Sequence, residues 1–173
     1  TANSSYEWIK QGKNYNAIGI DNDASVLLWA KENRLETLSN NEFNRIEVIE
    51  ADVMTMQPVS VDILSAFNFS YFVFSTREQL CDYFECSLST LKPDGIFFLD
   101  LFGGPEAHQE LIEKTEHDEF TYIWHQSEFH PLSHFIQCSI SFEFSDGSVI
   151  EDAFIYKWRL WSGPEIKELL LEA

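Results

Sequence analysis

The sequence has little positive charge. Its 173 residues include 11 lysines and arginines against 29 aspartates and glutamates, which gives a formal net charge of -18 at pH 7. The cations stand singly along the chain and form no basic patch. A field this negative repels the phosphates of nucleic acids and of anionic lipids. We therefore expect neither a nucleic-acid partner nor a membrane-surface partner.

Cysteines and long apolar runs are also scarce. The three cysteines, Cys81, Cys86 and Cys138, cannot all pair, and they contain no C-x-x-C motif. This usage is typical of a reducing compartment, where such residues act as small apolar side chains. The longest apolar stretch, 61–74, is interrupted by polar residues, whereas a membrane-spanning helix needs about 20 apolar ones. The sequence thus predicts a cytoplasmic protein without a membrane span.

The N-terminal part of the chain alternates between apolar runs and helical patterns. Four apolar runs have the length and composition of buried parallel strands: 16–21, 45–50, 61–67 and 96–101. Apolar residues recur at helical spacing in three segments: 3–11, 24–38 and 76–91. Asp23 is a candidate cap for the second of these helices, and a turn is expected at 92–95. Strands that alternate with helices predict an α/β fold with a doubly wound, Rossmann-like, mostly parallel sheet.

After the fourth visible strand the pattern changes to long alternating segments. Alternation of apolar and polar residues, interrupted by turn residues, predicts antiparallel strands at 120–129, 135–144 and 149–161. A last helix is expected at 163–173, with Pro164 near its start. We interpret residues 1–173 as a single domain with three parts: a βαβ part (1–104), an antiparallel insertion (105–161) and a returning helix (162–173).

Two acids stand where an open parallel sheet binds ligands, outside the carboxyl ends of its strands. Asp21 ends the first visible strand, and a carboxylate there can accept hydrogen bonds from two ribose hydroxyls. Asp52 ends the next strand, where it could accept from the exocyclic amine of an adenine ring, with Val53 in apolar contact. The alternatives are a helix cap for Asp21, which Asp23 already supplies, and an ordinary loop acid for Asp52.

A glycine-rich phosphate loop is missing from this pattern. In dinucleotide-type folds the ribose-binding acid follows such a loop by about 20 residues, and counting back from Asp21 reaches Thr1. We therefore expect the first strand and its glycine loop to precede the given sequence. The helix at 163–173 likewise lacks the strands that normally follow it, which predicts a chain truncated at both ends.

Five segments in order resemble class I S-adenosylmethionine-dependent methyltransferases. They are GID (19–21), EADV (50–53), DILSAFNFSYF (62–72), LKPDGIFFLDLFGG (91–104) and WRLWSGPEIKELLLEA (158–173). The Phe-Gly-Gly-Pro-Glu segment at 102–106 resembles, more narrowly, an uncharacterised bacterial-type branch. Thr1-Ala2 is similar to the tail of that branch's nucleotide loop, so the resemblance covers nearly the whole chain.

The resemblance implies methyl transfer from S-adenosylmethionine to a small-molecule acceptor. The cofactor residues that it implies are Asp21 at the ribose, Asp52 and Val53 at the adenine, and Asn68 beside the methionine part, together with the neighbouring Asn22 and Phe69. For Asn68, a cap of the following turn is the alternative. The run at 68–71 (NFSY) is similar to the N-P-P-Y box of amino-group methyltransferases, but it lacks both prolines. Amino-group specificity therefore stays open.

The aromatic side chains of the insertion are expected to lie over the strand ends and shape an acceptor pocket. The candidate pocket residues are Tyr71, Phe102, Trp124 and Trp161. Ring faces and negative charge suit a small organic or cationic acceptor. Core packing is the alternative for each ring, and a homodimer interface formed by the aromatic insertion would show the same composition.

The sequence identifies no general base and no metal site. Asp100 and Glu106 are candidate bases by location alone, and a structural or solvated role is the alternative for both. His125, His130 and His134 lack a cysteine or carboxylate at matching spacing, so no metal is expected. A catalytically silent cofactor-binding or protein-interaction module therefore stays an alternative to the enzyme. A nicotinamide-dependent dehydrogenase is disfavoured, because that chemistry needs no acid at the second strand end.

Overall fold

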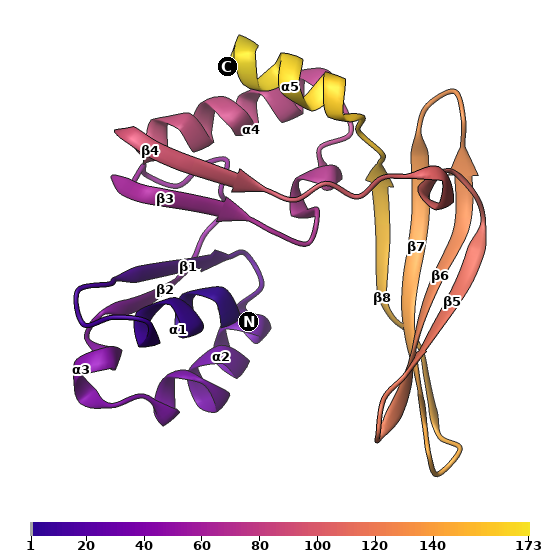
Figure 1. Ribbon diagram of the computed structural model, residues 1–173, viewed down its shortest axis with the longest axis horizontal. Coiled ribbons are helices and arrows are strands. Elements are labelled where there is room, and N and C mark those ends of the chain that lie inside the picture. Colours follow the sequence, from indigo (N-terminus) through magenta and orange to yellow (C-terminus); the bar gives the residue numbers. More distant parts are fainter. Residues whose placement is uncertain (1) are drawn as a thin grey trace. The chain divides into compact units, whose positions relative to one another are not determined.

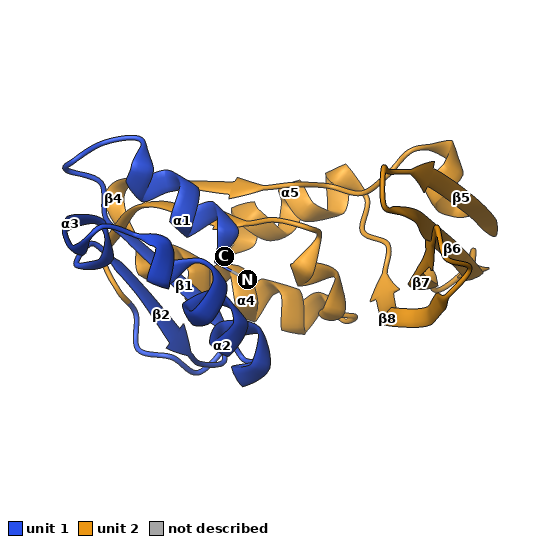
Figure 2. Ribbon diagram, turned by 90° about the horizontal axis from the view of Figure 1, so that it is seen from below, with its two compact units in different colours: residues 1–58 blue, residues 59–173 orange. Residues whose placement is uncertain are grey.

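The computed structural model describes residues 2–173, which form two compact units, Thr1–Pro58 and Val59–Ala173 (Figure 2). The predicted nucleotide-loop match at Thr1-Ala2 falls in part on Thr1, which lies outside the described residues. The interpretation of residues 1–173 as a single domain stays a prediction.

In the first unit, a pair of parallel strands packs against helices (Figure 1). Its elements are α1 (Asn3–Lys10), β1 (Ala17–Asp21), α2 (Ala24–Asn33), the 3-10 helix η1 (Leu35–Thr37), α3 (Asn40–Phe43) and β2 (Ile46–Glu50). β1 and β2 run parallel and end together, with Asp21 opposite Glu50. Ile9, Leu35 and Ile46 form the buried core cluster of this unit, so α1, η1 and β2 are held together by apolar contacts.

Side-chain bonds fix the element ends in this unit. Asp23 Oδ1 accepts from the backbone N–H groups of Ser25 (2.8 Å) and Val26 (3.3 Å), so the predicted cap of α2 is confirmed. The Arg45 guanidinium donates to the carbonyl of Ile9 (3.0 Å) and to two carbonyls in the turn after α1. The end of α1 is thereby satisfied and tied to the start of β2.

The second unit begins with another parallel pair. Its first elements are β3 (Val61–Ala66), the 3-10 helix η2 (Ser70–Val73), α4 (Arg77–Thr90), β4 (Leu91–Leu99) and the 3-10 helix η3 (Pro105–His108). Thr76 opens α4 with a capping box: its hydroxyl accepts from the Gln79 N–H (3.2 Å), and the Gln79 side chain accepts from the Thr76 N–H (3.2 Å). α4 then packs on both strands of the pair.

The turn predicted at 92–95 lies inside β4 as a bulge. Leu91 is opposite Val61 and Ile96 is opposite Ile63, so an advance from 91 to 96 along β4 matches an advance from 61 to 63 along β3. Gly95 suits this crowding, because a Cβ there would come within 2.9 Å of the Leu91 side chain. The expected turn is therefore corrected: α4 runs directly into its strand, and the extra residues are absorbed by the strand pairing.

The rest of the second unit is a four-stranded antiparallel sheet and a helix. The strands are β5 (Leu111–Glu116), β6 (Phe120–His130), β7 (Phe135–Phe144) and β8 (Val149–Arg159), paired in that order, and α5 (Gly163–Glu172) returns to pack on α4. The three predicted strands are confirmed, but β5 was not predicted. Its sequence, LIEKTE, places its only apolar residues at the start, as suits an exposed edge strand.

The predicted fold class is confirmed in part. The parallel pairing and the antiparallel insertion after the fourth strand are both present. The parallel strands are hydrogen-bonded as two pairs, β1–β2 and β3–β4, and their membership of one mostly parallel sheet stays a prediction. Each pair lies in its own unit. Among residues 2–173, no strand is hydrogen-bonded to both pairs.

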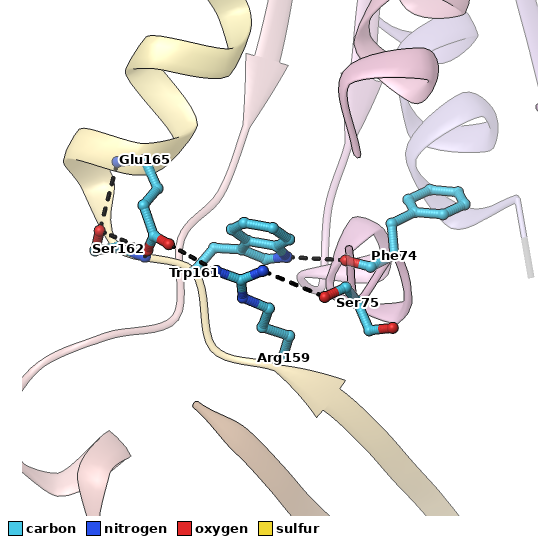
Figure 3. A network of polar contacts seen from close by, with 6 residues as sticks. All are labelled: Phe74, Ser75, Arg159, Trp161, Ser162 and Glu165. Carbon is cyan, nitrogen blue, oxygen red and sulfur yellow. Dashed lines mark hydrogen bonds and ion pairs between the residues drawn. The ribbon is translucent and has the colours of Figure 1, made fainter. Parts of the chain in front are cut away.

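Arg159 and Trp161 join the antiparallel sheet to the helices of the second unit (Figure 3). Trp161 Nε1 donates to the carbonyl of Phe74 (3.0 Å), and the Arg159 guanidinium lies 3.7 Å from the centre of the Trp161 ring. Arg159 also donates to the carbonyl of Ser75 (3.3 Å) and to the carboxylate of Glu165 (2.9 Å). The end of β8, the loop before α4 and the start of α5 are therefore held by one network.

Candidate functional site

The carboxyl ends of β1 and β2 bring two of the predicted cofactor residues to one edge. Asp21 is opposite Glu50, and the N–H of Ala51 donates to the Asp21 carbonyl (3.1 Å). Asp52 follows directly, so it lies at the same edge as Asp21. This placement agrees with the expectation that parallel strands collect their functional side chains at their carboxyl ends.

The Asp21 side chain is half-buried and largely unused by the fold. One carboxylate oxygen accepts from the N–H of Asp23 (3.1 Å), and the other has no hydrogen-bond partner among residues 2–173. Asp23 caps α2 in its place, and the hydrogen bond from the Ser25 side chain lowers the pKa of Asp23. Asn22 lies exposed between the two acids. Asp21 thus keeps acceptor capacity for a ligand.

Asp52 builds the turn that follows β2. Its carboxylate accepts from the N–H of Met54 (2.8 Å), and its carbonyl accepts from the N–H groups of Thr55 and Met56 (3.0 Å each). The loop-acid alternative therefore describes part of its role. The Asp52 side chain is exposed, as is that of Val53, at 40%, so both stay accessible to a ligand.

The loop after β3 has a rare backbone conformation. Asn68 (φ 58°) and Phe69 (φ 51°) are successive residues in the left-handed region, which costs an L-residue roughly 1–2 kcal/mol. The Asp100 carboxylate holds both: it accepts from the N–H of Asn68 (2.6 Å) and from that of Phe69 (2.9 Å). Hydrogen bonds to a charged group are each worth about 1.5–3 kcal/mol, enough to offset the backbone cost.

Asp100 and Glu106 are the candidate bases, and the structure shows what each of them contacts. Both carboxylate oxygens of Asp100 accept backbone N–H groups, so the structural alternative describes this residue. The Glu106 side chain is exposed, and its carbonyl accepts from the Gln126 side chain (2.9 Å). The contacts of neither residue identify it as a general base.

Aromatic rings from the loops and from the antiparallel sheet meet beside Phe69. The Phe69 ring centre lies 5.3 Å from that of Phe102 and 6.3 Å from that of Trp158. Trp124 lies 6.1 Å from Phe102, and Tyr156 stacks on Trp158 at 4.5 Å. We call the following residues the aromatic cluster: Phe69, Phe72, Phe102, Trp124, Tyr156 and Trp158.

Tyr156 and Trp158 belong to the aromatic residues of the insertion that are expected to shape the pocket. The alternation of β8 places both on one face. Cross-strand pairing then puts Tyr156 opposite Cys138, which is itself opposite Gln126. Trp124, two residues from Gln126, therefore shares this face.

Gln126 anchors the cluster, and no sequence signal identified it. Its side chain is 2% exposed and donates to the carbonyls of Glu106 (2.9 Å) and Gln109 (2.7 Å). Its amide oxygen accepts from Trp124 Nε1 (3.1 Å). The segment after β4 and the Trp124 indole are thus fixed by one buried amide.

Tyr71 and Trp161, two of the predicted pocket residues, are core residues. Tyr71 is 1% exposed and donates its hydroxyl to the Asp100 carbonyl (2.6 Å). Burial, together with the Asp100 charge, raises the pKa of Tyr71 well above its usual range. Trp161 is 2% exposed and donates to Phe74. The core alternative describes both, whereas Phe102 and Trp124 are half-buried and stay candidates.

Metal ligands do not gather in the part of the chain that the structure describes: among residues 2–173, no group of three or more histidine, cysteine or acidic side chains could hold an ion.

Cys138 is buried in β7, and burial raises the pKa of its thiol to about 12. No helix within residues 2–173 is both long and apolar enough to cross a membrane.

Comparison with known proteins gives matches by structure only. No protein-family model matches the chain, and no curated protein matches it. A S-adenosylmethionine-dependent methyltransferase from Clostridium acetobutylicum matches with a TM-score of 0.68 at 18% identity, over 90% of this chain and 62% of that chain. The CcbJ methyltransferase from Streptomyces caelestis matches with a TM-score of 0.72 at 15% identity, over 90% and 62% of the two chains.

A third match is an amino pentose methyltransferase from Micromonospora echinaspora, solved with S-adenosylmethionine bound. Its TM-score is 0.63 at 12% identity, over 91% of this chain and 65% of that chain. At these identities the likeness concerns the fold: the chain folds like part of a S-adenosylmethionine-dependent methyltransferase. It spans less than two thirds of the length of these three proteins. The resemblance to one bacterial-type branch stays a prediction.

Proposed function

We propose that this protein transfers a methyl group from S-adenosylmethionine to a small-molecule acceptor. The observation that carries the proposal is the match of 90% of the chain to methyltransferases of known structure. The acids at the carboxyl edge of β1 and β2 add a local reason, because both keep carboxylate oxygens for a ligand.

In this proposal the residues after β1 and β2 supply the nucleoside contacts. The Asp21 carboxylate accepts hydrogen bonds from the ribose hydroxyls, beside the exposed Asn22. Asp52 accepts from the adenine amine, and Val53 packs on the ring. Asp21 is half-buried, and Asn22, Asp52 and Val53 are exposed. Asn68 and Phe69, after β3, are the proposed contacts of the methionine part.

Methyl transfer from a sulfonium depends more on alignment than on proton transfer. S-adenosylmethionine supplies an activated methyl group. The protein's part is to hold the acceptor in line with it, which can lower the barrier by about 7–11 kcal/mol. A general base is needed only for a weak nucleophile, so the role of Asp100 in the fold does not count against catalysis.

The acceptor that we propose is a small organic molecule with a cationic or amine group. Phe102 and Trp124 are the half-buried candidates for its pocket, and the aromatic cluster supplies ring faces that attract cations. The net charge of -18 favours such an acceptor as well. One structural match acts on an amino pentose, which is consistent with this class.

A homodimer through the antiparallel insertion is a further part of the proposal. β8 is an edge strand, and its side chains Ile150, Phe154 and Ile155 are 50%, 53% and 56% exposed. Sedimentation equilibrium tests this directly. A monomer at all concentrations, or a dimer unaffected by Phe154→Ser, would remove this interface from the proposal.

Calorimetric titration with S-adenosylmethionine, S-adenosylhomocysteine and NAD tests the function. We expect binding of both sulfur compounds and none of NAD. Asp21→Ala and Asp52→Ala should weaken binding, whereas the matched control Asp118→Ala, in an exposed turn, should not. Binding of the sulfur compounds without methylation of any amine would favour a silent cofactor-binding module, which the lack of an assigned base also allows. No binding at all would refute the proposed function.

A further inference from the structure

One carboxylate shapes the loop that follows β3. The two oxygens of Asp100 bind successive backbone N–H groups, Oδ2 that of Asn68 and Oδ1 that of Phe69, across 32 and 31 residues of sequence. The Tyr71 hydroxyl donates to the Asp100 carbonyl, which fixes the same stretch from its other end. Asp100 is therefore attached to the loop by both its side chain and its backbone.

The hydrogen bonds to Asp100 determine which groups of the loop stay available to a ligand. The N–H groups of Asn68 and Phe69 both point to Asp100, and the Phe69 carbonyl accepts from the N–H of Phe72 (2.8 Å). What remains is the carbonyl and carboxamide of Asn68 and the ring of Phe69. The ring is held against Phe102 and Trp158.

We propose that Asp100 is a positioning residue for cofactor binding. It holds Asn68 and Phe69 in the left-handed conformation in which they meet the methionine part of S-adenosylmethionine, a role that rests on the proposed function. Without the carboxylate, Asn68 and Phe69 leave this conformation more readily, because the left-handed region is unfavourable for a non-glycine residue, and more so for Phe69 than for Asn68. The Phe69 ring then loses its fixed place in the aromatic cluster.

The test compares Asp100→Asn with a matched control. The asparagine has the shape of aspartate but turns an NH2 group toward one of the two N–H groups, so it can accept only one bond. Asp118→Asn makes the same change of charge in an exposed turn. We expect S-adenosylmethionine affinity to fall at least tenfold for Asp100→Asn and to stay unchanged for Asp118→Asn, by calorimetry.

A double-mutant cycle separates positioning from general damage. Glycine adopts the left-handed region without strain, so Asn68→Gly reduces the need for the carboxylate. The loss of affinity caused by Asp100→Asn should therefore be smaller in the Asn68→Gly background than in the Asn68 protein. Equal losses in both backgrounds would show that Asp100 acts otherwise than through this loop.

Amide hydrogen exchange in the ligand-free protein tests the loop without reference to function. We expect exchange at Asn68 and Phe69 to accelerate at least tenfold in Asp100→Asn, with exchange in α4 unchanged. If the parent protein binds no S-adenosylmethionine, the proposed function fails while this measurement still tests the loop. Unchanged exchange, or accelerated exchange with unchanged affinity, overturns the positioning role. Should Asp100→Asn not fold, Asp100→Glu, which keeps the charge but shifts both bonds, carries the same two expectations.

Discussion

The loops after β2 and β3 occupy equivalent places but are held in opposite ways. After β2, Asp52 binds the N–H of Met54, two residues ahead, and builds its own turn. After β3, Asn68 and Phe69 are bound by a carboxylate more than 30 residues away. The first loop is formed by local bonds and leaves its acid exposed. The second is shaped by a distant carboxylate, which binds two of its backbone N–H groups. The loop after β2 thus offers an exposed carboxylate, whereas the loop after β3 offers a fixed backbone conformation.

The largest expected effect sharpens this contrast between long-range and local packing. Trp158 is 5% exposed and contacts rings from β6 and from the loop after β3, so Trp158→Ala should cost about 3–5 kcal/mol of unfolding free energy. Trp8 is 41% exposed and stacks on the nearby Tyr15, so Trp8→Ala should cost far less. Denaturant titration measures both. Equal losses would mean that the aromatic cluster is not a core.

The next prediction concerns the ligand-binding edge of the first unit. Asp21→Asn should weaken S-adenosylmethionine binding by about 10- to 100-fold, because a hydrogen bond to a charged acceptor is worth about 1.5–3 kcal/mol. It should leave stability nearly unchanged, since Asp23 caps α2. Calorimetry and thermal unfolding of the same samples check the two halves of the claim. A large loss of stability would show that Asp21 serves the fold instead.

The contrast also explains how far the sequence could predict the structure. The Asp23 cap and the start of α5 beside Pro164 follow from residues within one helical turn, and both were predicted. The parallel pairs and three antiparallel strands follow from apolar periodicity. The role of Asp100 depends on backbone groups far along the chain, and that of Gln126 on carbonyls about 20 residues away. No residue type or spacing within a short window indicates such bonds.

The burial of two candidate pocket residues has the same origin. Tyr71 and Trp161 were candidates for the acceptor pocket, with core packing as the alternative. Their polar atoms instead bind carbonyls of Asp100 and Phe74 inside the unit. Burial of an amphipathic ring depends on which partner comes to cover it, and that is decided by tertiary contacts.

A smaller effect on stability is expected at Glu165, which makes both local and long-range bonds. Glu165 completes the cap of α5 with Ser162 and pairs with Arg159. Burial alone would raise the pKa of Glu165, but the bonds from Ser162 and the Arg159 charge lower it below 4.5. Because the folded pKa is the lower one, the stabilisation is present above the unfolded pKa and is lost as pH falls through the folded value.

Glu165→Gln should therefore cost about 1 kcal/mol at pH 7, and the difference from the parent protein should shrink below about pH 4.5, the ordinary glutamate pKa. Urea titrations at pH 7 and pH 3.5 measure it. Glu168→Gln, exposed on the same helix, is the control. A difference that stays constant with pH would assign the effect to the cap geometry and not to the charge.

The smallest expected effect concerns a long-range ion pair that is exposed. A long separation along the chain does not by itself make a contact strong. Lys92 and Asp62 pair at 2.9 Å across 30 residues, the same distance as Arg159 and Glu165, but their side chains are 46% and 80% exposed against 27% and 32%. Exposed ion pairs contribute about 0–1 kcal/mol and are screened by salt. Asp62→Asn should thus cost less than Glu165→Gln, and its cost should vanish in 1 M NaCl. A larger, salt-resistant cost would mean that the bulge at 92–95 depends on this pair, and that a long-range contact can shape a strand even at the surface.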